Sequence, residues 1–142
     1  MKVRIFSPAM GVAIVALMVA LTGSAMGAGQ ARNNVSPVFK TLKLVNHWTA
    51  SPFGTRAPAV GLLNGIVYFK GAMATTDANP VAFTLPTADR PAQAVYVTVD
   101  MCNATSGRLQ ILHSGVTTVQ AESGMFSNAA CFTSLDGVTF AR

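Results

Sequence analysis

Charged side chains are scarce in this sequence, and basic residues never form a run. Only 11% of the 142 residues are Asp, Glu, Lys or Arg, and the ten basic residues are scattered along the chain. Domains that bind nucleic acid gather Lys and Arg on one face or along one helix. The pattern therefore argues against nucleic acid as a partner.

Groups suited to acid–base catalysis are equally few, with five acids and two histidines. A catalytic nucleophile needs a His that an acid orients, but His113 and its neighbour Ser114 would point to opposite faces of a strand. Asp100 and Asp136 are candidates for the acid pair of a glycosidase, although Asp before Gly favours a turn. We predict that the protein is not an enzyme and has no cofactor.

Cysteine is rare as well, because Cys102 and Cys131 are the only two. No Cys-x-x-Cys motif occurs and no His lies at ligand spacing, so we predict no metal site. An even pair in an exported chain indicates one disulfide, whereas two buried thiols are the alternative. Closing a loop of about 30 residues would stabilise the fold by roughly 3.5 kcal/mol.

A long apolar helix is missing, and the one apolar run lies at the start of the chain. Lys2 and Arg4 precede the uncharged run from Met10 to Leu21, and small residues follow as far as Gly27. This order predicts a secretory signal peptide over residues 1–27, removed after Gly27. The alternative is a transmembrane anchor, but spanning a bilayer needs roughly 20 apolar residues.

Removal of residues 1–27 lowers the formal net charge from +5 to +3, because Lys2 and Arg4 lie there. We expect the mature protein to be secreted or periplasmic, without stable membrane insertion. Residues 28–40 are small and polar and include Pro37, which predicts a flexible N-terminal arm. Residues 41–142 are predicted to form one β domain.

Turn and strand signals organise this domain. Asn64-Gly65 joins the apolar runs Ala57 to Leu63 and Ile66 to Ala74, and this dipeptide predicts a type I′ hairpin. Asp136-Gly137 predicts a second hairpin of the same kind between residues 130–134 and 138–141. The clearest alternation runs from Ala92 to Asp100.

About nine short strands and no helix follow from this pattern. We therefore predict an all-β fold, either a single antiparallel β-sandwich or a partly closed barrel. By alternation, Leu109 and Ile111 point inward, Val67 and Phe69 share one face of their strand, and Val95, Val97 and Val99 share one face of theirs.

Exposed aromatics are the candidates for ligand binding, because rings with a polar edge suit binding surfaces. Trp48 is the only Trp, and we favour a core position for it because a small domain needs its largest aromatic buried. Phe53 lies in a loop with Pro and Gly and is a better exposed candidate. The candidate ligand-binding residues are Phe53, Arg56, Tyr68 and Tyr96.

The order of short motifs from Trp48 to Phe140 resembles the C-terminal tip domains of bacteriophage tail-fibre and minor tail proteins. After Trp48 and Arg56, the motifs are Asn64-Gly65-Ile66-Val67-Tyr68-Phe69-Lys70-Gly71, Phe83-Thr84-Leu85-Pro86, Arg90-Pro91, Gly107-Arg108-Leu109-Gln110-Ile111, Gly115 and Ser134-Leu135-Asp136-Gly137-Val138-Thr139-Phe140. The resemblance implies a compact β domain, often a homotrimer, whose loops bind a surface or receptor.

Together with the predicted signal peptide, this resemblance suggests a stand-alone secreted relative of the tip domain. The expected function is non-enzymatic recognition of a surface glycan or protein through loops. The alternative is a structural or assembly subunit of an extracellular or periplasmic complex, which a charge-poor surface would suit.

Overall fold

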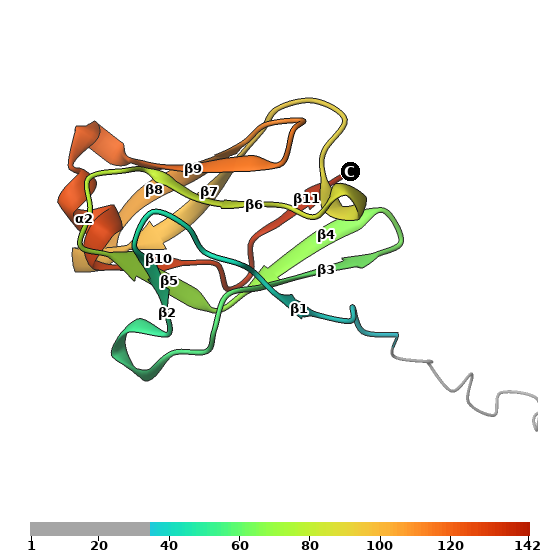
Figure 1. The fold of residues 1–142 in the computed structure, drawn as a ribbon, viewed down its shortest axis with the longest axis horizontal. Coiled ribbons are helices and arrows are strands. Elements are labelled where there is room, and N and C mark those ends of the chain that lie inside the picture. The colour runs from blue at the N-terminus through green and yellow to red at the C-terminus, as the bar shows by residue number, and fades with distance from the viewer. Residues whose placement is uncertain (1–34) are drawn as a thin grey trace, which may run out of the picture. The chain divides into compact units, whose positions relative to one another are not determined.

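The computed structural model describes residues 35–142, and its compact unit runs from Ser36 to Arg142. The predicted signal peptide and most of the predicted arm lie outside the described residues. Within residues 35–142 the chain forms eleven strands in two sheets and one short α-helix (Figure 1). The prediction of an all-β fold is confirmed. None of the helices in this part of the chain is long and apolar enough to span a membrane.

The smaller sheet contains the predicted Asn64-Gly65 hairpin. Its strands, in spatial order, are β1 (Lys40–Thr41), β3 (Ala59–Leu63), β4 (Ile66–Lys70) and β11 (Thr139–Ala141). Asn64 and Gly65 have φ values of 50° and 79°, which a type I′ turn requires at both central positions. Val67 and Phe69 are buried while Tyr68 and Lys70 are half-exposed, as the alternation predicts.

The larger sheet has seven strands and is nearly closed into a barrel. Their spatial order is β2 (Trp48–Ala50), β5 (Ala72–Thr75), β10 (Thr133–Ser134), β7 (Val95–Met101), β8 (Thr105–Ile111), β9 (Val116–Ala121) and β6 (Val81–Thr84). The segment before β2 reaches across to β6, because Val45 N–H donates to the Ala82 carbonyl at 2.9 Å and Leu44 pairs with Phe83. The two open edges of this sheet are thereby brought together.

Gly71 divides the apolar run from Ile66 to Ala74 into two strands, so this run is not the single strand that the sequence suggests. β4 belongs to the smaller sheet and β5 to the larger one. Gly71 has a φ of 90°, and a Cβ at this position would overlap the Ala57 carbonyl. Only glycine fits this change of sheet, because it lacks a Cβ and tolerates positive φ.

The prediction of a second hairpin at Asp136-Gly137 is wrong. β10 pairs with β5 and β7 in the larger sheet, whereas β11 pairs with β4 in the smaller one. The turn therefore crosses between sheets beside Gly71. The Asp136 carboxylate accepts the Gly71 N–H at 2.9 Å, and Leu135 N–H donates to the Gly71 carbonyl at 2.7 Å. Asp-Gly marks a turn but does not determine whether the flanking strands pair.

The prediction that no helix forms is also wrong, because α2 (Phe126–Cys131) is an α-helix of six residues. A helix this short cannot show a 3.6-residue pattern of apolar residues. The 3-10 turns are η1 (Pro52–Gly54), η2 (Thr87–Asp89), η3 (Cys102–Ala104) and η4 (Glu122–Gly124). Cys102 and Cys131 form the predicted disulfide, which joins η3 to the end of α2.

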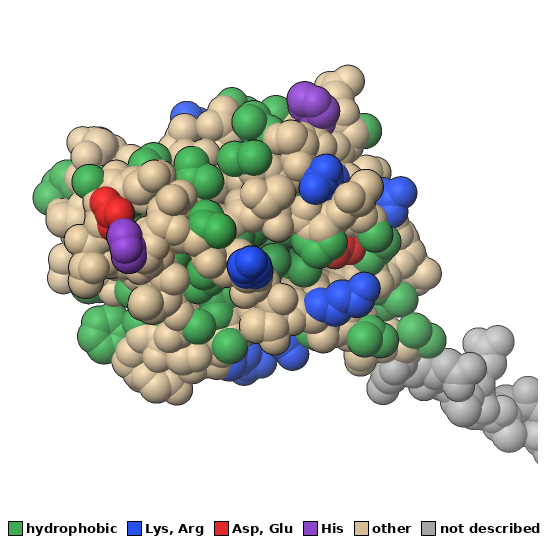
Figure 2. All heavy atoms as spheres, viewed as in Figure 1, with side chains coloured by type: hydrophobic (Ala, Val, Ile, Leu, Met, Phe, Trp, Pro, Cys, Tyr) green, Lys and Arg blue, Asp and Glu red, His purple; other side chains and the backbone are tan. Residues whose placement is uncertain are grey.

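The core lies between the two sheets and inside the curled larger sheet. It includes Val67, Phe69, Phe83, Leu109 and Ile111, all buried. Trp48 is also buried, as predicted, with its Nε1–H donating to the Asn79 carbonyl at 3.0 Å and its ring edge-on to Phe126. The surface seen in Figure 2 is mostly uncharged, with separate Lys and Arg side chains.

Candidate functional site

Nine polar side chains lie on the outer surface of β7, β8 and β9 and at the start of η4, which follows β9. We call this group the polar face. Strand pairing sets Tyr96 opposite Gln110, Thr98 opposite Arg108, and Asp100 opposite Ser106. The next pairing sets Arg108 opposite Gln120 and Gln110 opposite Thr118. Glu122 follows β9 directly. The nine members are Tyr96, Thr98, Asp100, Ser106, Arg108, Gln110, Thr118, Gln120 and Glu122.

The alternation of these strands explains why polar side chains dominate their outer surface, where Val116 at the start of β9 is an aliphatic exception. Successive side chains of a strand point to opposite surfaces of a sheet. Val99, Leu109 and Val119 face inward and are buried. Their sequence neighbours Thr98 and Arg108 are exposed on the outer surface. The core therefore fixes the backbone on which the polar face is displayed.

Four side chains of the polar face contact one another in a closed ring. Gln110 Nε2 donates to the Tyr96 hydroxyl at 2.8 Å, and Gln120 Nε2 donates to Gln110 Oε1 at 3.4 Å. Arg108 Nε donates to Gln120 Oε1 at 2.7 Å. The Arg108 guanidinium also lies 4.8 Å from the centre of the Tyr96 ring, which closes the ring of contacts. Each member thus restricts the rotamers of its neighbours.

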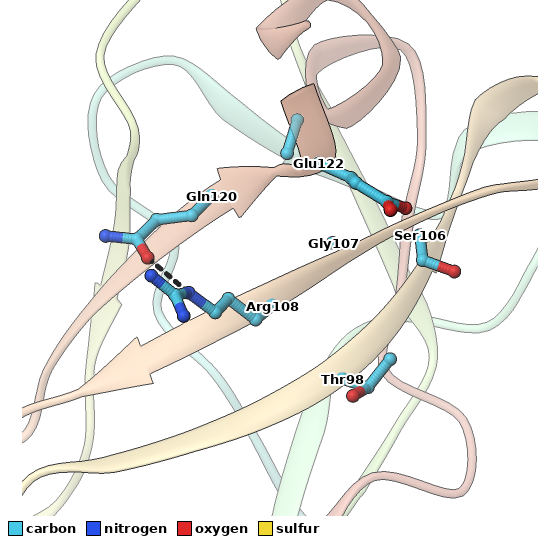
Figure 3. A pocket seen from close by; sticks show the side chains of 7 residues that line it. Thr98, Ser106, Gly107, Arg108, Gln120 and Glu122 are labelled. Carbon is cyan, nitrogen blue, oxygen red and sulfur yellow. Dashed lines mark hydrogen bonds between the residues drawn. The ribbon is translucent and has the colours of Figure 1, made fainter. Parts of the chain in front are cut away.

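A hollow of about 460 Å³ adjoins this ring. Figure 3 shows Arg108 and Gln120 on one side of the hollow, Glu122 and Ser106 on the other, and Thr98 below. Within the described part of the chain, no side chain or carbonyl accepts a hydrogen bond from the Nη groups of Arg108. The hollow therefore offers a guanidinium donor, a carboxylate acceptor and two hydroxyls to a ligand.

The four predicted ligand-binding residues are not brought together. Tyr96 belongs to the polar face and is 54% exposed. Tyr68 lies on β4 in the other sheet. Phe53, in η1, is 79% exposed, and its ring centre lies 6.0 Å from that of Phe132. Arg56 follows η1, with its Nε 3.8 Å from Asp136 Oδ1.

Arg108, Gln110 and Gln120 were not among the candidates that the sequence pattern indicated. The alternation that turns Leu109 inward also turns Arg108 and Gln110 outward, so part of the signal was present. The pairing of Arg108 with Gln120 could not be predicted in this way, because it depends on the register between β8 and β9.

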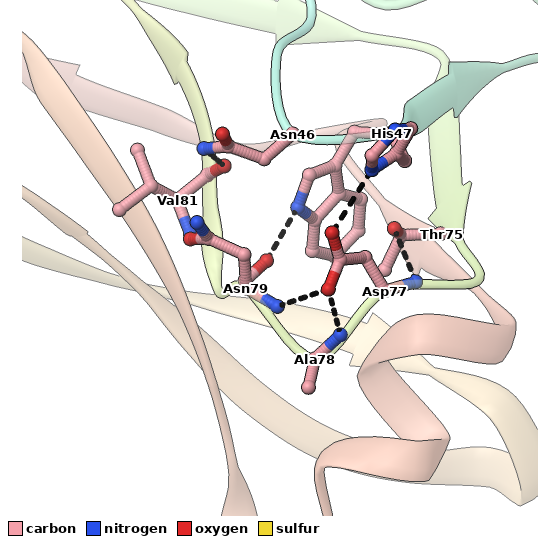
Figure 4. Close-up of polar contacts among 8 residues, drawn as sticks. Asn46, His47, Thr75, Asp77, Ala78, Asn79 and Val81 are labelled. Atoms are coloured by element: carbon pink, nitrogen blue, oxygen red, sulfur yellow. Dashed lines mark hydrogen bonds and ion pairs between the residues drawn. The ribbon is translucent and has the colours of Figure 1, made fainter.

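His47 and Asp77 form an exposed pair that joins two loops (Figure 4). His47 Nδ1 lies 2.9 Å from Asp77 Oδ2, and Asp77 Oδ1 accepts the Ala78 and Asn79 N–H groups. The hydrogen bond with His47, followed by the one from Ala78, lowers the pKa of the Asp77 carboxyl below its usual value. No group of three or more His, Cys, Asp or Glu residues that could hold a metal occurs in residues 35–142.

Comparison with known proteins shows similarity at the level of the fold. No protein-family model and no curated protein matches the chain. Among solved structures, the chain is similar to the receptor-binding protein of Listeria phage PSA, with a TM-score of 0.56 and 18% identity. The match covers 98% of this chain and 80% of that chain. The fold is thus like that of a phage receptor-binding protein.

Proposed function

We propose that this protein is a non-enzymatic binding module and that its polar face recognises a surface glycan. The observation that carries the proposal is the ring of Tyr96, Arg108, Gln110 and Gln120 beside a hollow of about 460 Å³. The fold shared with a phage receptor-binding protein supports a binding role. Predefined side-chain geometry favours binding because fewer rotamers must be ordered when a ligand arrives.

The chemistry of the hollow suits a saccharide better than a protein. A sugar hydroxyl both donates and accepts hydrogen bonds, so it can accept from Arg108 and donate to Glu122. Protein interfaces instead bury a core of apolar anchors, and the polar face has only the Tyr96 ring to offer. Recognition would therefore occur on a sheet surface, rather than on the loops that the sequence suggested.

We also propose that the protein is secreted or periplasmic. The predicted signal peptide over residues 1–27 would deliver the module to the periplasm or the cell exterior, where surface glycans are found. The Cys102–Cys131 disulfide fits an oxidising compartment.

A glycan array followed by calorimetry on each saccharide that binds tests the proposal. We expect Arg108→Gln and Tyr96→Ala each to weaken binding about tenfold or more, because a charge-assisted hydrogen bond and an aromatic contact are lost. Arg56→Gln is the matched control, since it removes one arginine outside the polar face and should bind as the wild type does. Equal binding by Arg108→Gln and the wild type would contradict the proposal.

A structural or assembly subunit is the second candidate, and Phe53 favours it. Phe53 is 79% exposed and is held at a φ of 54°, which is unusual for a bulky residue and often marks a functional loop. An exposed aromatic of this kind suits an interface with another subunit, including a homotrimer.

Light scattering of the wild type and Phe53→Asn tests this second candidate, because Asn tolerates positive φ. An oligomer that dissociates in the variant would support assembly through η1. A monomer at every concentration would remove this candidate.

A further inference from the structure

A second hollow, of about 200 Å³, lies between the smaller sheet and η2. Val38, Val60 and Leu62 give it an apolar wall, while Lys40 and Asp89 contribute its charged groups. It shares no residue with the polar face, so it is independent of the proposed glycan site.

Asp89 is the unusual member of this hollow. Asp89 as a whole residue is only 5% exposed to solvent. Its N–H donates to the Pro86 carbonyl at 2.9 Å, but within residues 35–142 its carboxylate has neither a hydrogen bond nor an ion pair. Every fully enclosed polar side-chain atom in that part of the chain has a partner. The carboxylate oxygens of Asp89 are therefore not fully enclosed, and Asp89 is one of the residues that line the hollow.

Within residues 35–142, no arginine forms an ion pair with Asp89. Arg90 Nε donates to the Leu85 carbonyl at 2.9 Å, and Arg142 Nη1 donates to the Ala88 carbonyl at 2.7 Å. A carboxylate on a residue that is only 5% exposed keeps little contact with water, and a donor from a ligand would give it a charge-assisted hydrogen bond.

We propose that this hollow binds a small apolar α-amino acid as its zwitterion. The ammonium group would donate to Asp89, and the carboxylate would lie toward Lys40. The aliphatic chain would pack on Val38, Val60 and Leu62. One acid and one base that form no ion pair with each other, separated by an apolar wall, match a ligand with one charge of each sign.

Titration of the protein with L-leucine, followed by NMR of the backbone amides, tests the proposal. Two analogues separate the contacts: 3-methylbutylamine lacks the carboxylate of leucine, and 4-methylpentanoate lacks its ammonium. We expect saturable shifts at residues 60–62 and 86–90 with leucine, and weaker binding of both analogues. Absence of a saturable shift at about 10 mM leucine, a weak-binding concentration, would overturn the proposal.

Variants identify which group holds which end of the ligand. Asp89→Asn should weaken leucine and the amine about tenfold or more, because a charged hydrogen bond is lost, and leave 4-methylpentanoate unchanged. Lys40→Gln should weaken leucine and 4-methylpentanoate but not the amine. Ala88→Leu, which retains both charges but fills the hollow, should abolish binding of all three. Asp77→Asn is the control acid and should bind as the wild type does. Unchanged leucine binding in Asp89→Asn would contradict the proposal.

Discussion

The two surfaces of β7, β8 and β9 differ in burial and polarity, so that neighbouring residues of one strand lie in opposite environments. Leu109 is fully buried on the inner surface, while Arg108, one residue earlier, is exposed on the outer one. The inner surface is apolar and contributes to the core. The outer surface is mostly polar, and four of its side chains, Tyr96, Arg108, Gln110 and Gln120, contact one another.

If the polar face binds a glycan as proposed, stability and recognition can be altered separately on one strand. Burial of an aliphatic side chain contributes a few kcal/mol, whereas exposed cross-strand pairs contribute about 0.2–1 kcal/mol each. Changes to the outer surface should therefore leave the fold intact while removing binding.

The disulfide should give the largest effect on stability, because it links residues 29 positions apart in the sequence. It joins the β7–β8 turn to α2, next to the Asn103–Asn128 hydrogen bond of 3.1 Å. Replacing both Cys102 and Cys131 by Ala should lower the free energy of unfolding by about 3.5 kcal/mol, measured by denaturant titration. Reduction of the wild type should give the same loss, and an unchanged midpoint after reduction would show that the bond does not stabilise this end.

Truncation of the inner surface should rank next. Leu109→Ala should lower the free energy of unfolding by about 3 kcal/mol, because it leaves a cavity in a fully buried site. The matched outer variant is Arg108→Ala, its sequence neighbour. If both variants lost equal stability, the proposed separation between the two surfaces would fail.

Changes to the outer surface should have a much smaller effect on stability. Arg108→Gln should change the free energy of unfolding by no more than about 0.5 kcal/mol, because surface substitutions rarely do more. The same variant should lose most of its saccharide binding, measured by calorimetry. A loss of several kcal/mol would mean that the ring of contacts supports the fold rather than a ligand.

The exposed pair of His47 and Asp77, outside both surfaces, should give the smallest effect and depend on pH. Because the pKa of Asp77 is lowered in the folded protein, its contribution is present above the unfolded pKa of about 4 and is lost as the pH falls through the folded value. Asp77→Asn should therefore melt slightly below the wild type at neutral pH, and the gap should close in acid. A gap that persists in acid would exclude a role for the carboxylate charge.

Alternation explains how much of the fold could be predicted from the sequence. It placed Leu109 and Ile111 inward and Val67 and Phe69 on one shared face, and all four are buried, while Asn64-Gly65 marked a genuine hairpin. The all-β class follows from these local patterns.

The crossings between the two sheets and the contacts within the candidate site depend on long-range strand pairing, which the local sequence pattern does not contain. Gly71 and Asp136 lie where the chain crosses between sheets, and their hydrogen bond spans 65 positions. Arg108 meets Gln120 only through the register of β8 and β9. Tyr96 was therefore identified as a candidate by residue type, whereas its partners were not.

Mapping a bound saccharide by NMR would test the central claim most directly. The saccharide would be one that binds on the array, and the amide and side-chain signals of the whole protein would be followed during titration. We predict that the largest shifts fall on Tyr96, Arg108 and Gln120, with little change at Phe53 or Tyr68. Shifts centred on Phe53 and Arg56, with none on β7, β8 and β9, would contradict the account.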